Sequence, residues 1–264
     1  PSLYRSLSKL RELFGEELPR YWDDLVEMGK SAGTNAFILY GDSLPRLAER
    51  FGEDFPKTWP DMLALAVASE GNAHKLISTG FPNLRDALND RLLRYWDDLV
   101  RIGRAAEGNA HLAFGFGIPE AKKALGDRFD AFWPGLVDLG LAAGKNQLSL
   151  FDRAVHSLVS VFGDGLEGAW DDLVRVGRPF GVHAGGFLAA DLPMLIRIGG
   201  EDRRAAVVTM KKLFSNGDRE ERIARNVLEI ARWMGVPGKK EERRDAFGGT
   251  LWERLSWIAN RRDI

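Results

Sequence analysis

Five of the eight tryptophans in this chain of 264 residues follow a single period of 37 residues. They are Trp22, Trp59, Trp96, Trp133 and Trp170. Leucine or methionine follows each tryptophan by three residues, an aliphatic residue by four, and glycine or alanine by seven. These offsets form one stripe along an α-helix, so each tryptophan is predicted to lie in the core on a helix packing stripe. The small residue at offset 7 is expected to let another helix backbone approach closely.

Two further registers divide each period into three predicted helices. Asparagine follows the tryptophan by thirteen residues in four copies, and His183 takes this position in the fifth. Gly71 and Gly108 precede two of these asparagines. Glycine followed by asparagine predicts a helix end and then an N-cap that opens a short third helix. An apolar residue followed by proline, as in Leu44-Pro45, predicts the first turn of the next short helix, where proline is tolerated.

A helical sequence period of about 20 to 50 residues is typical of a solenoid, in which each unit buries its apolar face against its neighbours. Three short helices in each 37-residue unit, with an asparagine opening the third, resemble the armadillo, HEAT and Pumilio class across about residues 6–200. The predicted fold is all-α, a right-handed α-solenoid of about five repeats. The predicted domains are an N-terminal half-repeat cap at 1–21, the repeats at 22–200, and a helical C-terminal cap at 201–264.

Composition excludes several classes of function. Thirty-seven basic and 38 acidic residues leave a net charge of −1, so no global field attracts nucleic acid or an anionic membrane. The absence of cysteine excludes disulfides and cysteine-based metal sites. No window approaches the roughly 20 apolar residues of a membrane span, and no signal-peptide pattern is seen, so a cytoplasmic location is expected. A single glutamine and no cysteine favour a thermostable protein.

No motif predicts catalysis, a cofactor or a metal site. Gly29-Lys30-Ser31 lacks the earlier glycine of a phosphate-binding loop. Residues 163–168 match Gly-x-Gly-x-x-Gly formally, but the equivalent residues 52–57 lack two of the glycines. The four histidines include no pair three or four residues apart, so a histidine metal site is not expected. We therefore expect a protein that is not an enzyme.

The short third helix is predicted to present a binding surface. At 100° per residue from the asparagine, offsets 1, 4 and 5 form the core face, whereas offsets 2 and 3 point the other way. Each asparagine is expected to cap its helix while its amide hydrogens remain available to an extended peptide or a base edge. The predicted partner-binding residues are Asn35, Phe37, Asn72, His74, Lys75, Asn109, His111, Asn146 and His183.

The armadillo-like resemblance implies a binding role, because those classes chiefly bind peptides, proteins or RNA. The leading hypothesis is a non-enzymatic scaffold that binds a protein or peptide along the third-helix face. The alternative is an RNA- or DNA-binding protein of the HEAT-like type that uses the basic C-terminal cap. Residues 201–264 carry fifteen Lys or Arg against eleven Asp or Glu, although interleaved glutamates also fit a solvated, salt-bridged surface. The basic residues are Arg203, Arg204, Lys211, Lys212, Lys239, Lys240, Arg243 and Arg244.

Acidic pairs follow the tryptophan in alternate copies, at Asp23-Asp24, Asp97-Asp98 and Asp171-Asp172. The simpler interpretation is that these carboxylates favour the helix dipole in the first turn. The functional interpretation is an acidic ladder that receives a basic partner.

Overall fold

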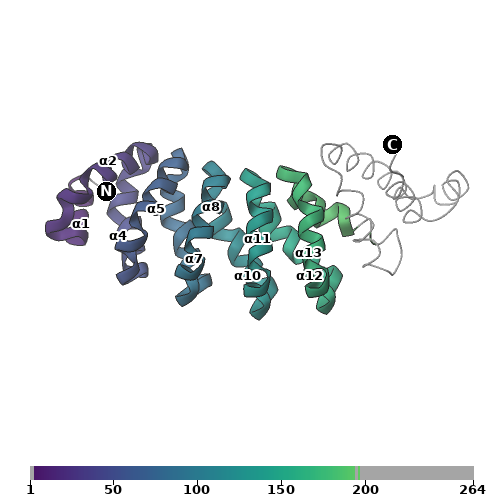
Figure 1. Ribbon diagram of the computed structural model, residues 1–264. Helices are drawn as coiled ribbons and strands as arrows, with labels where there is room; N and C mark the ends of the chain where they lie inside the picture. Colours follow the sequence, from purple (N-terminus) through teal and green to yellow (C-terminus); the bar gives the residue numbers. More distant parts are fainter. Residues whose placement is uncertain (1–2, 194–195, 197–264) are drawn as a thin grey trace, which may run out of the picture. The chain divides into compact units, whose positions relative to one another are not determined.

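The computed structural model describes residues 3–193 and 196, and this part of the chain is helical almost throughout and contains no strand (Figure 1). The all-α prediction is therefore confirmed for these residues. The described residues divide into two compact units, one of residues 3–123 with 144–148 and the other of residues 124–143 with 149–193 and 196. None of the described helices is both long and apolar enough to cross a membrane.

Each tryptophan of the 37-residue period lies on a longer helix or at its start. After α1 (Leu3–Phe14), these helices are α2 (Leu18–Ala32), α5 (Phe55–Ala68), α8 (Trp96–Ala106), α11 (Phe129–Ala143) and α13 (Leu166–Gly177). The predicted core position holds for Trp59, Trp96, Trp133 and Trp170, which are all buried. It is wrong for Trp22, which is 44% exposed, because no helix in the described residues covers this side of α2.

The predicted third helix and the following first helix form one continuous helix. In the first copy, α3 (Ala36–Ile38) continues through the π-helical turn η3 (Leu39–Ser43) into α4 (Leu44–Phe51), and the junction residues keep right-handed helical torsion angles. The prediction of three helices in each period is therefore wrong, because there are two. Equivalent helices follow as α6 (Ala73–Lys75), η6 (Leu76–Gly80) and α7 (Phe81–Leu88), then α9 (Ala110–Leu112), η9 (Ala113–Gly117) and α10 (Ile118–Leu125), then η12 (Ser149–Ala154) and α12 (Val155–Phe162), and finally α14 (Ala184–Gly186) and η15 (Phe187–Asp191).

The π-helical turn explains how proline is accommodated inside this continuous helix. Proline has no N–H to donate, and its ring clashes with the carbonyl four residues earlier in a regular α-helix. A wider π-helical turn directly before Pro45, Pro82 and Pro119 relieves both problems. His156 occupies the same position in the next copy and the π-helical turn persists there, so proline is not required for it.

Tight turns at two fixed registers connect the helices. All ten residues with positive φ in the described range fall at positions 15, 52, 89, 126 and 163 or at 33, 70, 107, 144 and 181. Both series have a spacing of 37 residues. Seven of the ten are glycine, which adopts this conformation without a steric penalty, whereas Glu70, Asn89 and Glu107 adopt it with a side chain. The connecting 3-10 turns are η1 (Gly15–Glu17), η2 (Gly33–Asn35), η4 (Gly52–Asp54), η5 (Glu70–Asn72), η7 (Asn89–Tyr95), η8 (Glu107–Asn109), η10 (Gly126–Arg128), η11 (Gly144–Asn146), η13 (Gly163–Gly165) and η14 (Arg178–His183).

In the first unit, aspartates on one helix accept hydrogen bonds from tryptophans one period later. Trp59 Nε1 donates to Asp24 Oδ2 at 2.7 Å, and Trp96 Nε1 donates to Asp61 Oδ2 at 3.0 Å. A buried indole N–H needs such an acceptor, because burial removes it from water. Asp24 thus has a partner within the chain, whereas Asp23 beside it is exposed.

In the second unit, Gly135 replaces the aspartate that would face Trp170. The Trp170 ring packs edge-on against Phe132, with ring centroids 4.7 Å apart. Its Nε1 is buried and has no acceptor among the described residues. A Cβ atom at Gly135 would lie 2.4 Å from this nitrogen, so the indole occupies the space that a side chain would need.

The small residue at offset 7 accommodates a side chain, and the prediction that it admits a helix backbone is wrong. A Cβ at Gly103 would lie 2.8 Å from Phe114 Cζ, and one at Gly29 would overlap the Tyr40 hydroxyl. Tyr40 uses this space to donate a hydrogen bond to the Leu25 carbonyl, and burial raises the pKa of Tyr40 to about 12.

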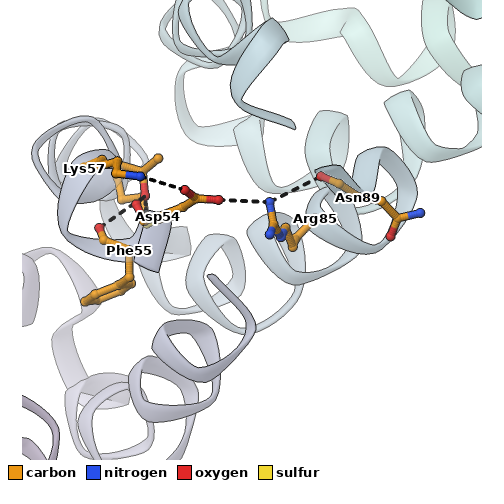
Figure 2. Close-up of polar contacts among 7 residues, drawn as sticks. Asp54, Phe55, Lys57, Arg85 and Asn89 are labelled. Carbon is orange, nitrogen blue, oxygen red and sulfur yellow. Dashed lines mark hydrogen bonds and ion pairs between the residues drawn. The ribbon is translucent and has the colours of Figure 1, made fainter. Parts of the chain in front are cut away.

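Polar contacts also connect successive copies at the turns (Figure 2). Arg85 Nη1 lies 3.4 Å from Asp54 Oδ2, and both side chains are only 20% exposed. The same nitrogen donates to the Asn89 carbonyl at 3.3 Å, while Lys57 Nζ lies 3.3 Å from the other Asp54 oxygen. Thr58 Oγ1 donates to the Asp54 carbonyl at 2.9 Å. These contacts hold the turn η4 against α7 of the next copy.

The continuous helices of neighbouring copies approach closely, and two adjacent glycines in α14 provide a test of this packing. A Cβ at Gly185 would lie 2.6 Å from the Leu150 backbone nitrogen, whereas one at Gly186 would meet nothing within 4 Å. We expect G185A to lower the free energy of unfolding by about 2 kcal/mol because the backbones must separate. G186A should be neutral or stabilising by up to about 1 kcal/mol, because alanine favours a helix. Urea unfolding of both variants measures the difference, and equal effects would contradict the close approach.

Candidate binding surface

Two identical five-residue segments, Glu-Gly-Asn-Ala-His at 70–74 and 107–111, lie at equivalent turns of the first unit. Each begins with a glutamate at positive φ, +46° for Glu70 and +52° for Glu107. Each then passes through a 3-10 turn into the short helix α6 or α9. The same local backbone therefore presents the asparagine and the histidine in both copies.

The asparagines that precede α3, α6 and α9 do not cap these helices. Asn35, Asn72 and Asn109 make no side-chain capping hydrogen bond, so the predicted capping role is wrong for them. Their φ values of −88° to −96°, with ψ near zero, differ from the extended backbone that N-caps usually adopt.

The amide nitrogens of two asparagines point to the next copy. Asn72 Nδ2 donates to the Gly108 carbonyl at 3.1 Å, and Asn109 Nδ2 donates to the Lys145 carbonyl at 3.0 Å. Part of the donor capacity expected to meet a peptide is therefore already used. A hydrogen bond that spans 36 residues could not be foreseen from the local sequence around either asparagine.

Positions at offset 2 from the asparagine become more buried along the first unit. Phe37 is 38% exposed, His74 is half-buried and His111 is 9% exposed. His111 is enclosed because the preceding copy lies against it: a Cβ at Gly80 would lie 3.4 Å from His111 Cα. The expectation that all offset-2 side chains face outward is therefore wrong for His111.

Positions at offset 3 form the accessible row. Ile38 is 41% exposed, Lys75 is exposed and Leu112 is half-buried. Phe116, which the sequence prediction missed, is 51% exposed one helical turn beyond Leu112. Its spacing of four residues from Leu112 was the signal, because such residues share a helix face. We call Ile38, Lys75, Leu112 and Phe116 the exposed row.

The two histidines and Lys75 create a basic environment at the edge of this row. Burial lowers the pKa of His111, and the positive charges of Lys75 and His74 lower it further. The Gly108 carbonyl, 3.1 Å from His111 Nδ1, opposes this shift by raising the pKa. His74 Nδ1 is buried and has no partner among the described residues. The arrangement offers apolar contact area beside cationic and imidazole donors.

The remaining predicted site residues lie elsewhere. Asn146 is exposed in the first unit, and His183 is exposed in the second unit. The basic residues between Arg203 and Arg244 lie outside the described residues. Within the described range, no group of three or more His, Asp or Glu side chains is arranged to hold a metal ion.

Comparison with known proteins adds no relative: no protein family, curated protein or solved structure matches this chain.

The environment of His111 predicts a pH-dependent stability. Because its pKa is lowered in the folded protein, the unfolded chain binds more protons as the pH falls through the ordinary histidine range near 6.5. The contribution of neutral, buried His111 to the free energy of unfolding is complete above that range and is lost as the pH falls through it. We expect H111Q to lose less stability than the wild type between neutral and mildly acidic pH, measured by urea unfolding. H183Q is the control at an exposed histidine, and an unchanged pH dependence in H111Q would contradict the assignment.

Proposed function

We propose that this protein is an α-solenoid of 37-residue repeats that acts as a non-enzymatic scaffold and binds a protein or peptide along its exposed row. The solenoid proposal is supported by the equal spacing of the turns and by the Trp–Asp and asparagine–carbonyl hydrogen bonds between copies. Contacts between neighbouring copies are how a solenoid buries its apolar surface.

The exposed row is the observation that carries the binding proposal. Ile38 and Phe116 remain 41% and 51% exposed on the first and third of the continuous helices, and Lys75 is exposed on the helix between them. Single exposed apolar residues are ordinary, but a row on neighbouring repeats forms an extended contact surface. Lys75 lies within this row and is exposed, so it can pair with a carboxylate of the ligand.

The spacing of the row suits an extended peptide. Neighbouring packed helices are typically about 8 to 10 Å apart, which equals about three residues of extended chain. A short peptide can therefore cross three helices and place apolar side chains near Ile38 and Phe116, with an acidic residue near Lys75. In this proposal Asn72 and Asn109 support the surface, since their hydrogen bonds set the spacing between copies.

The test is selection of binders to the full chain from a phage-displayed library of random peptides, followed by calorimetry with the enriched peptides. We expect enriched peptides to contain apolar and acidic residues and F116E to weaken them at least tenfold. L93E is the matched control, because Leu93 is 40% exposed and lies on η7, outside the continuous helices that carry the row. Unchanged melting temperatures would show that both variants remain folded. Failure to enrich peptides, or equal loss in L93E, would contradict the proposal.

Nucleic-acid binding by the basic residues from Arg203 onward is the second candidate, and only the charge of residues 201–264 favours it. Fluorescent single-stranded RNA and duplex DNA serve as probes. An affinity that falls steeply between about 50 and 200 mM salt and is insensitive to F116E would favour this candidate. A flat salt response would exclude it.

A further inference from the structure

One side of the first unit exposes apolar positions that are buried one period later. Leu7 is 39% exposed and Trp22 is 44% exposed, whereas the equivalent Leu44 and Trp59 are 0% and 2% exposed. Val26 is also 39% exposed, one turn beyond Trp22 on α2. This surface has the same chemistry as the contact between copies but is not covered by the described residues.

The contact one period later shows what such a surface accommodates. There, α5 packs against α2, and Trp59 Nε1 donates to Asp24. The counterpart of this interaction at Trp22 is missing, because the described residues provide no acceptor for its indole N–H. The surface therefore fits another amphipathic helix that offers apolar side chains and a polar partner.

The exposed stripe of α2 is complementary to itself. At 100° per residue, Trp22, Val26 and Lys30 lie within about 80° of one another, and Asp23 lies at the edge of this stripe. In an antiparallel pair centred on Val26, Trp22 and Asp23 at one end approach Lys30 of the other helix. This places a cation beside an aromatic ring and a carboxylate at both ends of the pair. Antiparallel packing also aligns opposite helix dipoles favourably.

We propose that this surface is a homodimer interface in which α2 packs antiparallel against α2 of a second copy. Among the described tryptophan helices, α2 is the one whose tryptophan is exposed, since Trp59, Trp96, Trp133 and Trp170 are at most 7% exposed. The matching uncovered stripe is therefore the same helix in another molecule. A two-fold axis produces this isologous contact and closes the assembly at two copies.

Sedimentation of the full chain over a micromolar concentration range tests the interface. We expect a monomer–dimer equilibrium in the wild type and a dissociation constant at least tenfold weaker in V26E. L93E is the control, because Leu93 has nearly the same exposure, 40%, and lies on another element. Val26 is 39% exposed, so the substitution should leave the melting temperature of the monomer unchanged. A monomeric wild type over the whole range, or equal effects of V26E and L93E, would overturn the proposal.

Two further variants test the antiparallel geometry. K30E should weaken the dimer, because it replaces the cation that faces Asp23 of the second copy with a second carboxylate, and the double variant D23K/K30E should restore the dimer. V26C should form a disulfide-linked dimer on mild oxidation, since the chain has no other cysteine, whereas L93C should remain monomeric. A dimer that is insensitive to V26E and is not linked by V26C would show that another surface is responsible. A monomer that captures an acidic helical peptide through Trp22 would instead identify a different occupant.

Discussion

The hydrogen bond from a buried tryptophan to an aspartate of the preceding copy is the interaction on which the first unit depends. A tryptophan buries a large apolar ring but carries an N–H that loses its water partner on burial. Asp24 and Asp61 supply an acceptor from the adjacent helix, so each bond favours the rotation and offset at which the two helices bring donor and acceptor together. The bond recurs after 37 residues, from Trp59 to Trp96, and so relates two consecutive pairs of helices in the same way.

The turns recur every 37 residues, and this regular spacing places side chains of successive copies at equivalent positions on the surface. The positive-φ turns end each helix at a fixed position, and the π-helical turn carries the chain through proline without breaking the continuous helix. Asn72 and Asn109 then join adjacent turns. Side chains at offset 3 of the first three copies, Ile38, Lys75 and Leu112, consequently stay exposed or half-buried at equivalent positions.

The periodic tryptophans and their offsets were sufficient to predict an all-α fold and the burial of Trp59, but several partners were not predictable from local sequence. Leu44-Pro45 looks the same at the start of a helix and after a π-helical turn, so the continuous helix was missed. In its local sequence Asn72 resembles an N-cap. Its actual acceptor, the Gly108 carbonyl, belongs to the next copy and leaves no signal near Asn72. The Trp–Asp contact did leave a signal, since an aspartate precedes Trp59 and Trp96 by 35 residues, whereas Gly135 takes that position before Trp170.

The most direct test of the Trp–Asp contact is a double-mutant cycle of D24A and W59F, measured as the free energy of urea unfolding. The cycle separates the hydrogen bond from the cavity that W59F creates. The cavity lowers stability equally in the presence and absence of Asp24, so its effect cancels when the two differences are compared. A charged acceptor on a buried donor predicts a coupling of about 1.5 to 3 kcal/mol. A coupling below about 0.5 kcal/mol, within the range expected for independent sites, would contradict the claim that the packing of the first unit depends on this hydrogen bond.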